Sequence, residues 1–132
     1  MDIYREEILE HWRNPRNFGR LKGANIIIDQ INPLCGDQVT FYFKIKDKKI
    51  ADVSFKGNGC AISIASASML SSFIKGRSID GLSKLTGADV LDLIGRPVSP
   101  ARLKCAFLPL EAIRKIVKFE AGNPKLETNT KS

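Results

Sequence analysis

The sequence lacks several features that would assign it to a class of protein at once. It holds a single histidine, no Cys-x-x-Cys pair, no internal repeat and no linker between domains. The first seven residues are too charged for a secretory signal, which needs an apolar stretch near the N-terminus. A cytoplasmic protein without a membrane partner is therefore expected.

The longest uncharged stretch, residues 57–74, approaches the roughly 18 residues of a membrane span. It contains five serines and two glycines, which favour a buried helix preceded by a turn. A length of 132 residues suits one domain. We expect that domain over residues 1–122, followed by a polar, disordered tail over residues 123–132.

The formal net charge of +7 is compatible with binding to nucleic acid or to an acidic protein. The basic residues are scattered, however, and the densest cluster, residues 44–49, is typical of a solvated hairpin tip. Aromatic residues are not interleaved with them as in a nucleic-acid interface. We expect no nucleic-acid partner, and an acidic protein is the favoured partner of the two.

The spacing of apolar residues predicts an α+β domain. Alternation with period two predicts two strands joined by the short link 47–49, which is typical of an antiparallel hairpin. The expected elements are a helix over 2–13, strands over 25–31, 39–46 and 51–56, and helices over 60–74, 87–94 and 100–121. The fold class is therefore a three-stranded antiparallel sheet with an N-terminal helix and with C-terminal helices packed on one face.

Several residues carry signals for helix ends. Thr86 and Asp89 resemble a capping box, and Ser78 can cap a short helical turn. Ser99 and Pro100 are typical of the N-cap and first position of a long helix. These signals set the predicted starts of the helices in the second half of the chain.

Three cysteines, Cys35, Cys60 and Cys105, are the principal candidates for chemistry. Their odd number and the reducing cytosol argue against disulfides, and any one of them alone is most simply a small buried apolar residue. Their places in the predicted fold favour a site instead. Cys35 lies in a turn, Cys60 where a strand gives way to a helix, and Cys105 in the first turns of the last helix, so the three side chains can converge at one rim of the sheet.

The residues around the cysteines suit metal ligation. Cys60 stands at a helix N-terminus, and Arg102 and Lys104 flank Cys105, so positive potential should favour the thiolates that bind metals. The alternative for Arg102 and Lys104 is a solvated helix face. Asp37 can supply a fourth ligand or merely cap its turn. A set of three Cys and one Asp fits tetrahedral zinc and also an iron–sulfur cluster, and ligand softness alone does not choose between them.

Four segments in order resemble the NifU/IscU/SufU-type scaffold family. They are the turn NPLCGD, the segment GNGCAIS, the segment ARLKCAFL and the N-terminal HWRNPRNFG, which matches the signature H-x-x-N-P-R-N-x-G. The resemblance covers about residues 2 to 120. It implies a small α+β scaffold that accepts sulfur from a cysteine desulfurase, combines it with iron and passes a [2Fe–2S] cluster to acceptor proteins.

The resemblance also assigns roles to residues. It implies the metal ligands Cys35, Asp37, Cys60 and Cys105. In the family a persulfide forms on the first or the last motif cysteine, so Cys35 and Cys105 are both candidates for the catalytic sulfur acceptor.

Two departures from the IscU branch favour the SufU branch of this family. Lys104 stands where the IscU branch has a histidine ligand, and residues 98–102 replace its chaperone-recognition motif. The SufU branch binds zinc through three Cys and one Asp, yet its usual extra segment does not fit between Cys60 and Cys105. The chain combines an IscU-like length with SufU-like ligands.

Four functions are therefore compared. The leading hypothesis is a non-enzymatic scaffold that transiently holds a [2Fe–2S] cluster, and the alternative is a zinc-dependent sulfurtransferase that stimulates a cysteine desulfurase. A structural zinc site in a nucleic-acid-binding module is disfavoured by the scattered charge. A cysteine hydrolase would need His11 as its base, and His11 is better explained as a packing or partner-surface residue.

Overall fold

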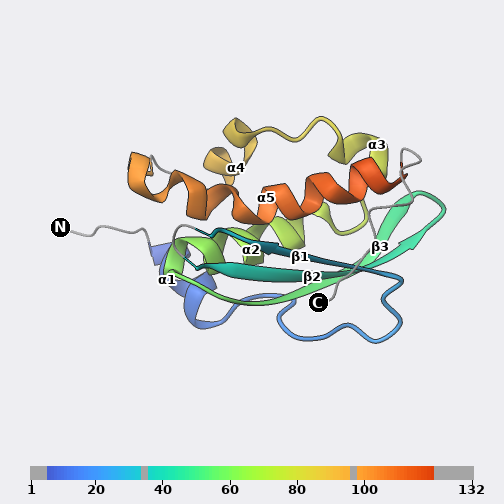
Figure 1. The fold of residues 1–132 in the computed structure, drawn as a ribbon, viewed down its shortest axis with the longest axis horizontal. Helices are drawn as coiled ribbons and strands as arrows, with labels where there is room; N and C mark the ends of the chain where they lie inside the picture. The colour runs from blue at the N-terminus through green and yellow to red at the C-terminus, as the bar shows by residue number, and fades with distance from the viewer. Residues whose placement is uncertain (1–5, 34–35, 96–97, 121–132) are drawn as a thin grey trace.

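The computed structural model describes residues 6–33, 36–95 and 98–120, with side chains described up to residue 118 (Figure 1). Its elements in chain order are α1 (Glu6–Arg13), β1 (Ile26–Ile31), β2 (Gln38–Lys46), β3 (Lys49–Asn58), α2 (Ala61–Ile74), α3 (Ile79–Leu82), α4 (Gly87–Ile94) and α5 (Pro100–Glu120). The predicted α+β class is confirmed.

The three strands form one antiparallel sheet in the order β1-β2-β3. Phe41 stands opposite Ile28 on one side and Phe55 on the other, which fixes the register. Asp47 and Lys48 turn the chain between β2 and β3 with positive φ angles of 54° and 60°, as a tight two-residue hairpin requires. The predicted hairpin is thus confirmed, with β3 beginning at Lys49.

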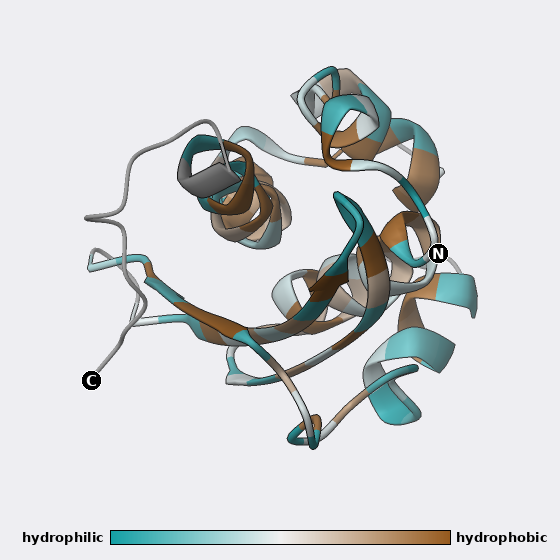
Figure 2. Ribbon diagram, turned by 90° about the vertical axis from the view of Figure 1, so that its right-hand side faces the viewer, coloured by the Kyte–Doolittle hydropathy of each residue, from teal (hydrophilic) through white to brown (hydrophobic). Residues whose placement is uncertain are grey.

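The core lies between the sheet and the two long helices. Figures 1 and 2 show α2 and α5 on the same side of the sheet, with the loop that precedes β1 on the other side. Phe41 stacks on Phe43 and on Phe55 at centroid distances of 5.7 Å each, and all three rings are fully buried. Alternating aromatic residues on β2 therefore form the apolar face of the sheet against which the helices pack.

Helix α2 is the central helix of the domain. It contacts α1, α4, α5 and β3, and its small Ala and Ser residues allow this close approach. Four of its serines are buried: Ser63, Ser66, Ser68 and Ser71. A helix buried on nearly all sides needs partners for its hydroxyls, and they come from neighbouring elements.

The N-terminal segment binds to this helix through hydrogen bonds. His11 Nδ1 lies 2.6 Å from Ser68 Oγ, which also accepts the backbone N–H of Arg16 at 2.8 Å. Asn17 Nδ2 donates to Ser71 Oγ at 2.9 Å. His11 is therefore a packing residue at the contact of α1 with α2, as one of the two sequence interpretations has it. Of the predicted helix 2–13, the first part lies outside the described residues.

The helix ends follow the sequence signals closely. Thr86 and Asp89 form a capping box, and Ser78 Oγ accepts a bond from a backbone N–H in the first turn of α3. Helix α5 begins at Pro100. In the three described stretches, no helix is at once long enough and apolar enough to cross a bilayer. The predicted tail, residues 123–132, lies outside the described part of the chain.

The buried face of α5 differs from the predicted stripe. Leu110 and Ile113 are buried as expected, but Phe107 is only half-buried, and Cys105 is 6% exposed within the apolar core. The helix passes over the sheet so that Cys105 and its neighbours, rather than Phe107, turn toward α2. Cys105 thus belongs to the core and to the candidate site at once.

Candidate metal centre

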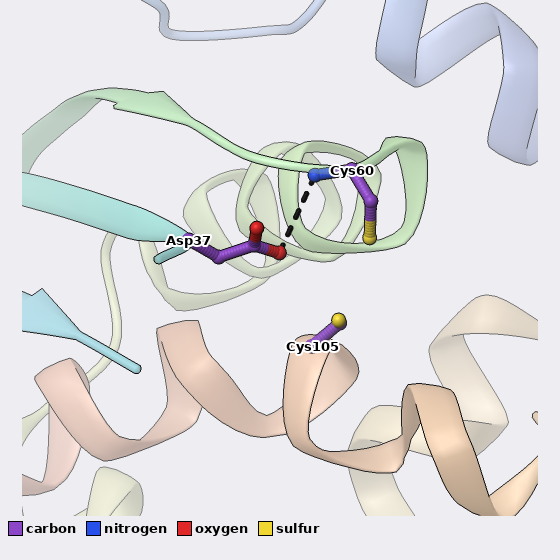
Figure 3. Close-up of side chains that lie close together, drawn as sticks. All are labelled: Asp37, Cys60 and Cys105. Atoms are coloured by element: carbon purple, nitrogen blue, oxygen red, sulfur yellow. Dashed lines mark hydrogen bonds between the residues drawn. The ribbon is translucent and has the colours of Figure 1, made fainter. Parts of the chain in front are cut away.

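Three of the predicted ligands converge at one rim of the sheet. The ligand atoms of Asp37, Cys60 and Cys105 all lie within 4.8 Å of one another (Figure 3). Asp37 immediately precedes β2, Cys60 is the N-cap of α2, and Cys105 lies in the second turn of α5. The predicted fourth ligand, Cys35, lies outside the described residues. His11 is not a member of this cluster.

The turn before β2 presents Asp37. Asn32 N–H donates to the carbonyl of Asp37 at 2.9 Å, and Gly36 N–H donates to the carbonyl of Asn32 at 2.7 Å. Gly36 has a φ of 82°, a left-handed conformation that glycine adopts without steric cost. The backbone of this turn therefore favours glycine at position 36, and the turn ends with the Asp37 side chain aimed at α2 (Figure 3).

Two glycines let Cys60 approach Asp37. A Cβ atom on Gly57 would lie 2.5 Å from the backbone oxygen of Gln38, and one on Gly59 would lie 3.0 Å from Asp37 Cγ. Neither glycine has a positive φ, so close approach of neighbouring atoms, rather than backbone conformation, explains both. The spacing Gly-x-Gly-Cys is thus a steric requirement of the site.

Asp37 acts as a hydrogen-bond acceptor across the rim. Its Oδ2 accepts the Ser63 hydroxyl at 2.7 Å and the Cys60 backbone N–H at 3.3 Å. Burial by itself raises the pKa of Asp37, but the bonds from Ser63 and Cys60 outweigh it and hold that pKa below its ordinary value. Asp37 is therefore ionised at neutral pH and available as a ligand.

The thiol of Cys105 has the opposite character. Burial, together with the nearby Cys60 and Asp37 side chains, raises the pKa of Cys105 to about 12. The net shift is thus opposite to the one expected from Arg102 and Lys104, and the influence of these two residues on the thiol stays a prediction. Arg102 and Lys104 are both exposed to solvent, whereas Cys105 points into the core beside a carboxylate. A bound cation would reverse this balance by replacing the proton.

Sequence reasoning missed two residues that affect the hydrogen bonding around Cys105. Ser63, three residues after Cys60, is fully buried, and its Oγ contacts both Asp37 and the carbonyl of Cys105. Pro109 lies within α5, four residues after Cys105. Because proline has no N–H, the Cys105 carbonyl loses its usual partner in the helix. The offsets of three and four residues from a cysteine are the sequence signals that could have identified them.

The donor set fits a small, thiophilic cation. Zinc binds thiolates at about 2.3 Å in tetrahedral geometry, which places ligand atoms roughly 3.5–3.8 Å apart. A spread of at most 4.8 Å in the metal-free chain requires a closure of about 1 Å, within reach of side-chain rotation. Two sulfurs and one carboxylate oxygen leave one position of a tetrahedron for a further ligand.

A small α+β domain with a thiol–carboxylate centre at one rim of its sheet is the class that the fold and the site define together. The chain belongs to the NifU-like N-terminal domain family, whose model matches residues 3–125. The match spans every element of the fold and all three cysteines.

Named relatives come from two branches. The chain is 37% identical to the "Zinc-dependent sulfurtransferase SufU" of Bacillus subtilis, over 92% of this chain and 94% of that protein. It is 34% identical to the "Iron-sulfur cluster assembly scaffold protein IscU 1" of Archaeoglobus fulgidus, over 95% of this chain and 82% of that protein. Similar identities to both branches leave the branch of this chain unassigned.

Solved structures share the fold. A crystal structure described as a putative iron–sulfur cluster assembly scaffold protein for the SUF system, from Fervidobacterium islandicum, aligns with a TM-score of 0.72 at 27% identity. That alignment covers 85% of this chain and 94% of the other. The N-terminal part of a NifU-like protein from Brucella abortus aligns with a TM-score of 0.75, at 24% identity and over 92% of this chain and 96% of the other.

Proposed function

We propose that this chain is an iron–sulfur cluster assembly scaffold that accepts sulfur from a cysteine desulfurase and transiently holds a [2Fe–2S] cluster as its cargo. The observation that carries the proposal is the convergence of Asp37, Cys60 and Cys105 within 4.8 Å. Membership of the NifU-like family supports it. Cys35, two residues before Asp37 in the chain, is the proposed fourth ligand.

The cysteines of the site have two proposed roles, as metal ligands and as the acceptor of sulfur. The cation or cluster, when bound, supplies Lewis acidity that keeps the cysteines as thiolates. Cys105 is 6% exposed, so burial favours Cys35 as the sulfur acceptor that a partner protein reaches, with Cys105 as the other candidate. In that transfer the acceptor thiolate attacks the outer sulfur of the desulfurase persulfide, and the desulfurase cysteine leaves as a thiolate.

The test measures the iron and acid-labile sulfide bound to the protein, which is purified and handled without oxygen. Iron and acid-labile sulfide in equal amounts, with a visible chromophore that oxygen bleaches, are expected after incubation with iron, cysteine and a desulfurase. Alanine replacement of Cys60 should abolish the chromophore while the domain stays folded by circular dichroism. A colourless wild-type protein without sulfide under these conditions would contradict the scaffold function.

A second candidate, a zinc-dependent sulfurtransferase that stimulates a cysteine desulfurase, is favoured by the site itself. Lys104 cannot serve as the additional ligand that a histidine at this position would offer, because a protonated amine does not bind metal. The donors that remain are cysteines and one aspartate, a set that suits zinc. This function predicts one zinc per chain without sulfide, and desulfurase turnover that rises with the wild type and not with Cys35→Ala.

A further inference from the structure

Ser63 touches every described residue of the metal centre. Its hydroxyl oxygen lies 2.7 Å from Asp37 Oδ2, 3.3 Å from the carbonyl oxygen of Cys105 and 3.8 Å from Cys60 Sγ. The residue is fully buried in the first turn of α2, three positions after Cys60. A buried hydroxyl among three candidate ligand residues has more contacts to the site than helix packing alone requires.

The hydroxyl has one proton to share among these acceptors. The bond to Asp37 is the shortest, and it is assisted by the charge of the carboxylate. The Ser63 hydroxyl therefore donates its hydrogen bond to the ionised Asp37. Oδ2 also accepts the Cys60 backbone N–H at 3.3 Å. This oxygen is the one turned toward the Cys60 and Cys105 sulfurs in Figure 3, so the bond from Ser63 fixes the direction of the carboxylate within the site.

We propose that Ser63 is a positioning residue that holds the Asp37 carboxylate in the orientation in which it can bind a metal together with Cys60 and Cys105. This inference rests on the proposed function, since it needs a cation at the centre. The bond from Ser63 turns the carboxylate toward the two sulfurs before a cation arrives. Residues that orient a ligand in this way raise the metal affinity of a site. Ser63 therefore strengthens the binding of a cation at this centre.

The structure supplies a control for the packing role of Ser63. Ser66, three residues further along α2, is 1% exposed, and its hydroxyl donates to the carbonyl of Ala106 at 2.7 Å. Both serines thus bridge α2 and α5 from buried positions. Of these two serines, only Ser63 has a hydrogen bond to Asp37 in the described part of the chain, so the pair separates positioning from packing.

The test compares zinc affinity, measured by competition with a chelator, in full-length Ser63→Ala and Ser66→Ala. Residues that orient metal ligands typically contribute about 10- to 100-fold in metal affinity. We expect a loss of that size for Ser63→Ala and a change below about twofold for Ser66→Ala, with similar decreases in the urea midpoint. Equal zinc affinities in the two variants would overturn the positioning role.

Two further measurements link the effect to Asp37. In an Asp37→Ala background, Ser63→Ala should cause no additional loss, because the group that it orients is absent. The absorption spectrum of bound cobalt(II), which reports the arrangement of the ligands, should change in Ser63→Ala and stay unchanged in Ser66→Ala. A full additional loss of affinity in the Asp37→Ala background would show that Ser63 does not act through Asp37.

The outcomes also separate this inference from the function beneath it. A wild-type chain that binds neither zinc nor cobalt would overturn both. If the wild type and Ser63→Ala bind zinc with equal affinity, only the role of Ser63 is overturned. If Ser63→Ala does not fold, Ser63→Thr and Ser63→Val give the same comparison, since they share a shape and differ in the hydroxyl; higher affinity in the threonine variant is expected, and equal affinity would contradict the proposal.

Discussion

The replacement of Gly59 by alanine tests the geometry of the centre with a single methyl group. The added Cβ would lie 3.0 Å from Asp37 Cγ, 3.1 Å from Asp37 Oδ2 and 3.2 Å from Ser63 Cβ. Ordinary carbon contacts begin at about 3.5 Å, so the Asp37 carboxylate must retreat by roughly 0.5 Å. Functional metal–ligand distances hold to about ±0.2 Å, so a retreat of this size should weaken metal binding.

The same replacement should leave the fold nearly intact. Gly59 does not have a positive φ, and alanine at a compatible position stabilises a protein by about 0.4–1 kcal/mol through the unfolded chain. That gain offsets part of the contact strain, and we expect a free energy of unfolding within about 1 kcal/mol of the wild type. Gly57→Ala should instead destabilise the domain by about 1–3 kcal/mol, because its Cβ would lie 2.5 Å from the backbone of β2.

The assay is zinc competition together with urea unfolding on the wild type, Gly59→Ala and Gly57→Ala. We expect zinc affinity to fall about 10-fold or more in Gly59→Ala, comparable to the effect of other groups that orient ligands. In an Asp37→Ala background the penalty of Gly59→Ala should vanish. Unchanged zinc affinity in Gly59→Ala, with the fold preserved, would refute the assignment of Asp37 as a ligand.

Three further predictions concern the fold. Burial, and next the positive charge of Arg16, lowers the pKa of His11 below 6.5, so the unfolded chain binds more protons in that range. The free energy of unfolding should therefore fall as the pH drops from 7 through 6, and pH-dependent urea unfolding should show a smaller decline in His11→Gln. Phe41→Ala should cost about 3–5 kcal/mol in the same assay, since the ring is fully buried and stacked on two others. Thr86→Ala should cost about 0.5–2 kcal/mol by removing the cap of α4, and a loss below 0.2 kcal/mol would contradict the role of the capping box.

Local signals were sufficient for the fold because each element has its own. The alternation of Phe41 and Phe43 with polar neighbours gave β2, and the Thr86–Asp89 pair gave the start of α4. The burial of Cys105 could not be predicted from such local signals. Its burial depends on how α5 crosses α2, a tertiary contact that the spacing within α5 does not determine.

The candidate site was predictable in its members and not in its electrostatics. Turn and helix ends placed Asp37, Cys60 and Cys105 at one rim, and the structure brings these three together. The charges adjacent in sequence do not set the direction of the pKa shift of Cys105, since Arg102 and Lys104 are exposed to solvent while Cys105 is buried. The neighbours that decide the pKa of Cys105 come from other elements, and only the folded chain reveals them.

Asp37 contributes both to the fold and to the site. Cys60 is the N-cap of α2 but makes no side-chain capping bond, and Asp37 accepts its N–H from the neighbouring turn instead. A carboxylate at this end also complements the helix dipole. Because this contact forms in the metal-free chain, we expect the rim to be assembled before a cation arrives. Asp37→Ala should then lower both stability and metal affinity, whereas Cys60→Ala should lower metal affinity far more than stability, since the N–H that Asp37 accepts belongs to the backbone.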